Sequence, residues 1–467
     1  MKPEHMRPEN TIFVLLSFEG PDPYSLAGGL GVRITHVAHT LARKGFYTHL
    51  FFIGDPNGKG EEYLEDGKLI MHRWCQWISA SHLSGVYDGE YAKHEDYSRS
   101  MPPWVIERIV RPAVADGKLV AVLAEEWHTA EGACRLSEQL KAAGLRDEVG
   151  IFWNANNTFG FEHIDWARLQ RETTVTAVSR YMKHIMRDLG VPTLVIPNGI
   201  PEDLLRPVNE EASAETRARL AGDPLLLKVA RWDPGKAWMQ SVEGAALLKK
   251  NGRRPILIAR GGMEGYGTEV LLHASGLGLK VQDVSADGDS VETKLEAITS
   301  AGDADILNVK FHCQHELLRT LYHASDAVLA NSTHEPFGLV GLEVMASGGV
   351  VFTGGTGEDY AQHFFNSIVL DTNDAEEIAS YLDYLGAHPG VGERLRRAGQ
   401  MTARQYTWPF VIDGLIERLE SRARVRGALA KPYEVVIEHA MEARGEPSHL
   451  DAPAVAGHVE QRAVASQ

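Results

Sequence analysis

Short apolar runs alternate with amphipathic helical patterns along most of the chain. Thr11–Ser17 is apolar almost throughout, and after a glycine-rich turn Val37, Ala38 and Leu41 recur at helical spacing within about 32–44. Continuous apolar runs indicate strands that are buried on both faces, and the helical spacing indicates a helix that packs on the sheet. Further strands are predicted at Tyr47–Ile53, Leu119–Ala124, Gly150–Asn154 and Val175–Val178. This alternation predicts a doubly wound parallel sheet.

The same alternation starts again after a proline-containing segment, Pro192 to Pro207. Strands are then predicted at Leu225–Val229, Ile256–Ala259, Asp305–Val309, Ala327–Ala330, Val350–Phe352 and Ile368–Leu370. A chain of 467 residues is long enough for two or three domains. We therefore expect an α/β protein with one doubly wound domain at 1–195 and a second at 196–405, which helices within about Ala375–Leu395 complete.

Two segments fall outside this pattern. Residues 54–112 are long for a connection between a strand and a helix and are rich in aromatic residues: Trp74, Trp77, Tyr87, Tyr91, Tyr97 and Trp104. They predict either a helical lobe with its own small core or an acceptor-binding region, since sugar rings stack on flat aromatic faces. Residues 447–467 are small and polar and are expected to form a disordered tail.

The composition limits the classes of partner. The chain has 63 acidic and 47 basic residues, for a net charge of −16, which argues against nucleic acid or an anionic membrane as the main partner. Three widely spaced cysteines favour a reducing cytoplasm over a disulfide framework. Because the sequence shows neither an apolar signal core nor an apolar stretch of transmembrane length, we expect a cytoplasmic protein. The sequence leaves open whether it is a homo-oligomer.

Glu335 and Glu343 are the most informative pair of residues. They follow the apolar run Asp326–Ala330, with Glu335 beside a Pro-Phe-Gly turn and Glu343 inside a helix predicted at Gly338–Ser347. A strand, a tight turn and a helix place Glu335 at the carboxyl edge of a parallel sheet, where α/β proteins bind ligands. The amides that open the helix can hold an anion. Two carboxylates here suit the ribose and the sugar of a nucleotide-sugar.

This segment resembles the E-x7-E element of retaining glycosyltransferases of the GT-B fold, in the glycosyltransferase family 4 and glycogen-synthase-like group. The resemblance implies that Glu335 lies by the donor sugar and that Glu343 binds the ribose. It also implies that Phe337, Gly338 and Leu339 form a turn that contacts the sugar. Two Rossmann-like domains would face a central cleft, and a terminal helix at 406–426 would return to the first domain through apolar residues that include Phe410, Leu415, Ile416 and Leu419.

Arg231 and Lys236 follow the first predicted strand of the second domain with the spacing R-x4-K. A diphosphate leaving group gains charge as the glycosidic bond breaks, so fixed cations at its oxygens stabilise the transition state more than the ground state. The spacing is similar to the donor-diphosphate cations of the same family.

Gly28-Gly29-Leu30-Gly31 follows the first strand. Glycines let the backbone approach a phosphate, and the sequence resembles the loop of that family over the donor diphosphate, so Gly28 and Gly29 are predicted to bind the donor. Bacterial glycogen synthases carry Lys-Thr where this chain has Leu26 and Ala27, which speaks against a glycogen synthase. A dinucleotide fingerprint fails because its third glycine falls on Ile34.

His128 lies in Glu125–Ala130 (Glu-Glu-Trp-His-Thr-Ala), which resembles the D-W-H-T-A string of that family with Glu126 in place of the aspartate. The resemblance places His128 beside the donor sugar and the reacting centre. The amides of Asn154, Asn156 and Asn157 end the next strand, where they could bind sugar hydroxyls or serve the fold.

Two patterns that could bind metal are interpreted differently. Asp287-Gly288-Asp289 precedes a helix in a hydrophilic stretch and is taken as a surface turn. His312, Cys313 and His315 precede an amphipathic helix, where packing or backbone contacts to a nucleobase are favoured over zinc. No metal or cofactor is therefore expected.

The sequence thus predicts a retaining, metal-independent hexosyltransferase with His128 and Glu335 at the reacting centre. It would move a hexose, with glucose as the first choice, from a nucleoside diphosphate sugar such as UDP-glucose or ADP-glucose to the hydroxyl of a carbohydrate-like acceptor. Retention and the hexose follow from the resemblance. Two alternatives remain: a nucleotide-sugar 2-epimerase of the same fold, and a non-catalytic protein that binds nucleotide-sugars. The base of the donor and the acceptor are not specified by the sequence.

Overall fold

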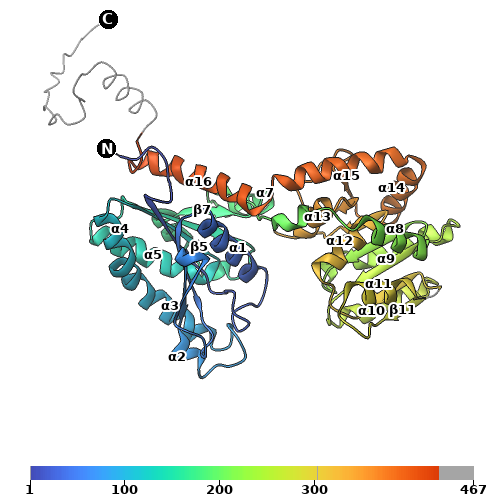
Figure 1. Cartoon of the computed structure of the whole chain (residues 1–467), viewed down its shortest axis with the longest axis horizontal. Helices are drawn as coiled ribbons and strands as arrows, with labels where there is room; N and C mark the ends of the chain where they lie inside the picture. The colour runs from blue at the N-terminus through green and yellow to red at the C-terminus, as the bar shows by residue number, and fades with distance from the viewer. Residues whose placement is uncertain (1, 302, 431–467) are drawn as a thin grey trace, which may run out of the picture.

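The computed structural model describes residues 2–301 and 303–430, so the tail predicted at 447–467 lies outside the described residues. Two sheets form the centre of the molecule. The first has eight strands in the order β3-β4-β2-β1-β5-β6-β7-β8, and the second has seven in the order β11-β12-β10-β9-β13-β14-β15. In both sheets the first strand of the domain lies in the middle and its neighbours run parallel to it. The predicted α/β fold with two doubly wound domains is confirmed (Figure 1).

The strands of the first sheet are β1 (Thr11–Leu16), β2 (Tyr47–Ile53), β3 (Glu61–Leu64), β4 (Leu69–Trp74), β5 (Leu119–Glu125), β6 (Val149–Ala155), β7 (Thr174–Ala177) and β8 (Leu194–Val195). The helices around it are α1 (Gly29–Arg43), α2 (Gln76–Ser79), α3 (Glu90–Val105), α4 (Arg111–Ala115), α5 (Trp127–Ala142), α6 (Trp166–Glu172) and α7 (Arg180–Asp188), with short turns of helix at Glu65–Gly67, Ile106–Val110 and Phe161–His163. β5 is buried along its whole length, which explains why its sequence is an unbroken apolar run.

The segment 54–112 is not a separate helical lobe, which corrects one of the two interpretations above. β4 pairs in parallel with β2, and β3 pairs with β4 as an antiparallel hairpin, so the segment extends the first sheet. Trp74 and Trp104 pack around the ring of Phe51 on β2, and Tyr97 is fully buried. These rings therefore belong to the core of the whole domain: Trp74 lies on β4 of its sheet, and Tyr97 and Trp104 lie on α3, which packs against it.

The strands of the second sheet are β9 (Leu225–Val229), β10 (Ile256–Arg260), β11 (Val281–Val284), β12 (Ile306–Val309), β13 (Ala327–Ala330), β14 (Val351–Thr353) and β15 (Ile368–Val369). Its helices are α8 (Glu210–Leu220), α9 (Trp238–Lys250), α10 (Tyr266–Gly276), α11 (Val291–Thr299), α12 (His315–Ala324), α13 (Leu339–Ala346), α14 (Ala375–Ala387) and α15 (Pro389–Arg404), with short turns at Glu202–Leu205 and Pro234–Lys236. The helices predicted within about 375–395 are α14 and α15, which are separate because Pro389 starts the second and cannot donate a backbone hydrogen bond to the first.

The last described helix, α16 (Trp408–Val425), lies along the first domain, whereas α15 lies over the second (Figure 1). Trp408, Leu415 and Leu419 are buried in one cluster with residues of β1 and α1, and Ile416 packs against that cluster. The predicted return to the first domain is therefore present. Phe410 is an exception, since it is 56% exposed and takes no part in this contact.

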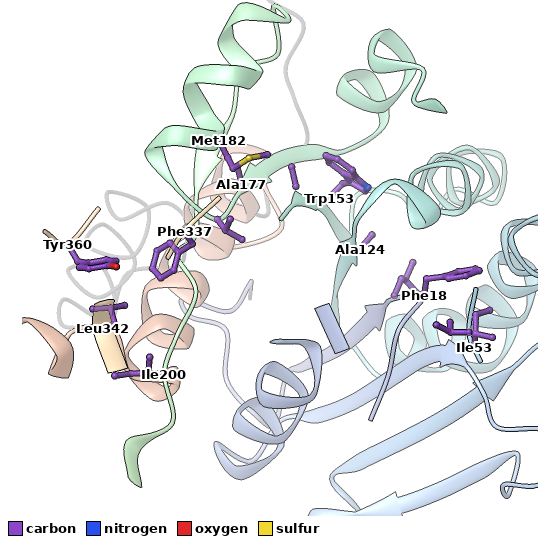
Figure 2. Close-up of a cluster of buried hydrophobic side chains, with 14 of the residues drawn as sticks. Phe18, Ile53, Ala124, Trp153, Ala177, Met182, Ile200, Phe337, Leu342 and Tyr360 are labelled. Carbon is purple, nitrogen blue, oxygen red and sulfur yellow. The ribbon is translucent and has the colours of Figure 1, made fainter. Parts of the chain in front are cut away.

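Three sets of contacts join the domains. The backbone N–H of Arg180, at the start of α7, donates to the carboxylate of Asp359 in the second domain (3.0 Å). The backbone of Ile200 bonds to Tyr406 and Trp408 on either side of residue 407. One cluster of buried side chains also runs from Phe18 in the first domain to Tyr360 in the second (Figure 2).

Among the described helices, none combines the length and the apolar character that a membrane span requires.

Candidate active site

Charged side chains of the second domain meet in a pocket of about 170 Å³ at the carboxyl ends of β9 and β13. Four residues singled out from the sequence are among those that line it: Arg231, Lys236, Glu335 and Gly338. The edge at which parallel strands end is where open α/β sheets bind ligands. The structure thus brings these four residues, which are up to 107 positions apart in the sequence, to one place.

Lys236 and Glu335 contact each other across this pocket. The Lys236 ammonium donates to a carboxylate oxygen of Glu335, and both side chains are partly exposed. Their loops are tied together, because the backbone N–H of Thr333 donates to the carbonyl of Gly235 (2.9 Å). The side chain of Asp233 also accepts from the N–H of Gly235 (2.8 Å), which fixes the turn that carries Lys236. Both charges are therefore held in place before any ligand binds.

Arg231 lies on the same loop with an exposed side chain. Its carbonyl accepts a hydrogen bond from the indole of Trp238 (2.8 Å), and the ring of the next residue, Trp232, is buried against that indole. The backbone is thus anchored while the guanidinium remains free to reach a ligand, an arrangement suited to bidentate contact with phosphate oxygens.

Lys228 also lines the pocket, although the sequence analysis passed over it. It lies in the middle of the second sheet on β9, is 1% exposed, and donates to the carbonyl of Leu329 (3.0 Å) and to the side-chain oxygen of Asn331. Burial lowers the pKa of Lys228 to about 7. The sequence did mark this residue, because Lys228 lies inside the otherwise apolar run Leu225–Val229. Burying an ammonium group costs free energy unless it is paired or hydrogen-bonded.

The turn before α13 is shaped by Gly338, whose φ of 82° is in the region that favours glycine. The Tyr360 hydroxyl donates to the Gly338 carbonyl. The ring of Phe337 is buried against Tyr360 and Tyr406 (Figure 2), and Phe337 is not among the residues that line the pocket. Leu339 is half-buried and packs on the same core. Contact of Phe337 with a donor sugar would therefore have to come from its backbone.

Glu343 lies farther along α13 and does not line the pocket itself. Its carboxylate lies 3.5 Å from the hydroxyl of Tyr322, at the long limit for a hydrogen bond. Burial raises the pKa of Glu343. The two glutamates are thus in different surroundings, one beside a cation and the other beside a phenol.

In the first domain, the carboxylate of Glu19 binds backbone amides of the glycine-rich loop that was predicted to bind phosphate. One Glu19 oxygen accepts from the backbone N–H groups of Gly28 (2.9 Å) and Gly31 (3.0 Å), and the other accepts from the Tyr87 hydroxyl (2.6 Å). The Gly28 amide is therefore engaged within the protein in this structure, and its contact with the donor diphosphate stays a prediction. Gly29 differs, since none of the described atoms lies within 4 Å of where its Cβ would be, and a ligand could approach it.

His128 lies in the first turn of α5 and is 2% exposed. Its ring stacks on Phe18 (centroids 4.1 Å apart) and on Trp127 (3.9 Å). Its Nε2 lies 2.6 Å from a carboxylate oxygen of Glu90, whereas its Nδ1 is buried without a partner among the described residues. Burial lowers the pKa of His128 to about 3, so the imidazole is neutral at pH 7, with Nε2–H donating to Glu90 and Nδ1 left as a hydrogen-bond acceptor.

Glu126 begins α5 in a strained conformation. Its φ of 68° and ψ of 169° belong to a region populated almost only by glycine, and such strain gathers at functional sites. Burial raises the pKa of Glu126 to about 8. Its carboxyl group accepts from the backbone N–H of Asn156 (2.8 Å), which ties the loops after β5 and β6 together.

The neighbouring residue, Glu125, binds the side-chain amides of Asn154 and Asn156, two of the three that were considered as sugar ligands. Its carboxylate accepts from the side-chain amides of Asn154 (2.8 Å) and Asn156 (2.7 Å), and it pairs with Arg33 (3.3 Å). These amide groups are part of a hydrogen-bond network inside the protein. This favours a role in the fold over a role in binding sugar hydroxyls.

The predicted residues thus form two groups on two domains. Arg231, Lys236, Glu335 and Gly338 share the pocket of the second domain, whereas the contacts of His128 and of Gly28 described above are with residues of the first domain. Of the discounted metal pattern, Asp289 pairs with Lys294 (3.1 Å). Over residues 2–301 and 303–430, no three His, Cys, Asp or Glu side chains form a group that could hold a metal ion.

Comparisons with known proteins agree with this geometry. The family model for glycosyl transferases group 1 matches residues 209–402, which include the whole pocket of the second domain. A D-inositol 3-phosphate glycosyltransferase from Nocardia farcinica is 28% identical, with a match that covers 48% of this chain and 46% of the relative. Another, from Saccharomonospora viridis, is 25% identical over 86% of this chain and 91% of the relative. The chain thus spans about half of the first relative and most of the second.

The fold is also that of a solved structure described as trehalose-6-phosphate from E. coli bound with UDP-2-fluoro glucose. The two chains superimpose with a TM-score of 0.58 at 14% identity, which covers 87% of this chain and 98% of the other. At this identity the likeness extends to the fold alone.

Proposed function

We propose that the chain, which has the GT-B fold and matches the model of glycosyl transferases group 1 over residues 209–402, is a glycosyltransferase that transfers a hexosyl group from a nucleoside diphosphate sugar to a carbohydrate hydroxyl with retention. The observation that carries the proposal is the pocket in which Arg231, Lys236 and Glu335 meet. Two cations suit a diphosphate, and a carboxylate beside them suits the sugar that leaves it.

UDP-glucose is the first donor to test. The trehalose-6-phosphate structure is described as bound with UDP-2-fluoro glucose, which supports a UDP-linked glucose here. ADP-glucose is the second choice. In either donor, we propose that Glu343 accepts hydrogen bonds from the ribose hydroxyls while Glu335 lies at the sugar, because the two glutamates point to different surroundings on α13 and its preceding turn.

The proposed reaction follows from the charges in the pocket. As the bond between the anomeric carbon and the phosphate breaks, negative charge grows on the diphosphate, and Arg231 and Lys236 stabilise it. The acceptor hydroxyl attacks from the same face and gives its proton to the departing phosphate, which preserves the configuration. Glu335 and the neutral His128 would orient the sugar while positive charge develops on it. Metal independence and the absence of a cofactor are part of this proposal.

A cytoplasmic location is also proposed. Cys75, Cys134 and Cys313 are free thiols buried in the structure, as expected in a reducing compartment.

Donor and acceptor screening tests the proposal. Nucleoside diphosphate sugars are first ranked by the rise they cause in Tm, and the best donor is then incubated with carbohydrate acceptors while nucleoside diphosphate release is followed. Transfer with retention, shown by NMR of the product, is the expected result. Binding of a donor that is epimerised without acceptor would instead identify a 2-epimerase, and donor binding without any turnover would identify a binding protein.

A further inference from the structure

The loops at the carboxyl edge of the first sheet face the proposed reaction with carboxylates and aromatic rings, while their cations are engaged within the protein. We propose that the acceptor, in the transfer proposed above, is an uncharged sugar or glycan rather than a sugar phosphate. The inference rests on the proposed function and narrows it. The charge of these loops carries it, and the unpartnered nitrogen of His128 and the exposed aromatic faces are compatible with it.

The loops offer few cations. Within the described segments 17–31, 54–60, 75–94, 126–131, 155–165 and 178–180, the lysines are Lys59 and Lys93 and the one arginine is Arg180, which pairs with Asp359 and donates to the carbonyl of Glu358. Lys93 is fully buried, and its ammonium donates to the hydroxyl of Tyr24 (2.6 Å) and to two carbonyl groups. Lys59 is exposed on the connection between β2 and β3, toward the outer strands of the sheet. Phosphate groups are usually bound by arginine or lysine, so these loops are poorly equipped for one.

The arginines just behind these loops are also committed. Arg33 pairs with Glu125, and Arg73 makes a bidentate contact with Asp22 (2.7 and 2.9 Å). Of the cations that line the pocket of the second domain, Arg231 and Lys236 are assigned to the donor diphosphate, and the buried Lys228 donates to Leu329 and Asn331. A phosphate on the acceptor would therefore compete with the donor for the same charges.

Carboxylates stand where the acceptor would lie. Glu90 is partly exposed beside His128, and Glu19 lies at the start of α1 next to Tyr87. A phosphate dianion brought beside two carboxylates would meet like charges, which costs free energy at short range. A neutral hydroxyl can instead donate a hydrogen bond to the partly exposed carboxylate of Glu90, whereas the carboxylate of Glu19 is buried and engaged within the protein.

His128 adds a separate chemical argument. Its Nε2–H is engaged with Glu90, and its buried Nδ1 has no partner among the described residues. In the neutral ring this atom is an acceptor only. A sugar hydroxyl can donate to it, and because a phosphorylated sugar also carries hydroxyls, this nitrogen suits an uncharged acceptor without selecting against a phosphorylated one.

Aromatic faces surround this place on the surface. Tyr91, next to Glu90, is 81% exposed, and Trp77 on α2 is 70% exposed. The indole of Trp77 lies 3.4 Å from Asp96, which links α2 to α3. Such faces bind uncharged sugar rings by stacking, and they explain why these rings remain outside while Tyr97 from the same segment is buried.

Matched acceptor pairs test the inference on the full chain. With the best donor, kcat/KM is measured for glucose against glucose 6-phosphate, fructose against fructose 6-phosphate, and inositol against inositol phosphate, together with maltose and maltotriose. We expect at least one uncharged acceptor to exceed every phosphorylated one by about tenfold or more. A phosphorylated acceptor that exceeds all uncharged ones overturns the inference. Donor binding and donor hydrolysis are measured alongside, so that loss of both would refute the transferase itself rather than the choice of acceptor.

A charge reversal provides the second test. Glu90→Lys places a cation where the acceptor phosphate would lie, so the ratio of kcat/KM for a phosphorylated acceptor to that for its uncharged partner should rise about tenfold. Glu95→Lys, the same change at an exposed position of the same helix, is the matched control and should leave the ratio unchanged. The ratio cancels any general loss of activity from disturbing His128. An unchanged ratio in Glu90→Lys would show that the acceptor does not lie beside Glu90.

Discussion

At the scale of single residues, Lys236 and Glu335 hold each other in the absence of donor. A donor that binds between them exchanges this contact for two others: phosphate oxygens at Lys236 and sugar hydroxyls at Glu335. Because the pair is only partly buried, separating it costs little compared with a fully buried ion pair. The contact therefore keeps both groups oriented without blocking the pocket.

The diphosphate clamp gives the first prediction. Lys236→Ala or Arg231→Ala should lower kcat by about two orders of magnitude or more, because an aimed charge is typically worth ~3 kcal/mol at the transition state. Lys250→Ala, an exposed lysine at the end of α9, is the control and should retain activity. Near wild-type turnover of either clamp variant would remove that residue from the mechanism.

If two cations are enough for the diphosphate, no metal is required. Activity should therefore persist in excess EDTA, with kcat within about twofold of the untreated enzyme as rates are followed with and without chelator. Complete loss of activity that Mg²⁺ or Mn²⁺ restores would contradict this, and Asp287 and Asp289 would have to be reconsidered.

Substitutions of Glu335 and Glu343 should affect different parts of the donor. Glu343→Gln keeps the shape but loses a charged hydrogen-bond acceptor, so it should weaken binding of the free nucleoside diphosphate by about 1.5–3 kcal/mol. Glu335→Gln should leave that affinity nearly unchanged while it lowers turnover. Calorimetry with the product nucleotide on both variants decides. Equal losses of nucleotide affinity would mean that the sugar does not lie at the turn.

At the scale of elements, the corner between β5 and α5 carries a buried acid. Burial raises the pKa of Glu126 to about 8, well above the value of a carboxyl group in an unfolded chain. Below pH 4.5 both states are protonated and the group has no effect. Between pH 4.5 and 8 the folded state keeps the proton that the unfolded state has lost, so stability falls as pH rises, by up to about 1.4 kcal/mol per pH unit.

Glu126→Gln should therefore gain stability relative to the wild type between pH 5 and pH 7.5. Denaturant unfolding at the two pH values measures the difference. Glu138→Gln on the same helix is the control, because a hydrogen bond from Arg168 holds the pKa of Glu138 below its usual value and its ionisation is complete over this range. A stability difference for Glu126→Gln that does not change with pH would show that the folded protein ionises Glu126 normally.

The same scale shows what a sequence can and cannot predict. Strands buried on both faces, such as β5 and β13, were predicted from their apolar runs. β3 and β11 were missed because they lie at sheet edges and carry exposed polar residues, so burial leaves little pattern in them. The spacing of motifs in the sequence identified the pocket residues Arg231, Lys236 and Glu335. The contact between Lys236 and Glu335 could not be predicted from that spacing.

Side-chain direction was the other limit. The positive φ of Gly338 turns the chain so that Phe337 enters the core. The pattern of residue types alone does not predict the direction of that turn. Glu19 was missed because its partners, the amides of Gly28 and Gly31, lie across a folded loop. Lys228 could be recognised as unusual, since a lysine in an apolar strand is exceptional. Its role could not be predicted, because its hydrogen-bond partners, Leu329 and Asn331, are brought to it only by the fold.

At the scale of the whole molecule, the proposed reaction requires both domains. His128 and Gly29 belong to the first domain, and the pocket with Arg231 and Lys236 belongs to the second. The connections between the domains include the Arg180–Asp359 contact, the backbone bonds of Ile200 with the residues that precede and begin α16, and the buried cluster that runs from Phe18 to Tyr360. Few contacts cross at such a junction, which favours movement of one domain relative to the other.

We therefore expect the domains to close around the donor. Closure would bring His128 to the sugar held at Glu335 and would exclude water, which otherwise hydrolyses the donor. Small-angle scattering should show a smaller radius of gyration with saturating nucleoside diphosphate sugar than without it. Lys236→Ala should show a smaller decrease at the same donor concentration, because a ligand shifts a conformational equilibrium only through contacts that differ between the two states. Identical scattering with and without saturating donor would contradict closure. His128 would then lie too far from the second domain to act on the sugar, and the reacting centre would have to be built from the residues around Glu335 alone.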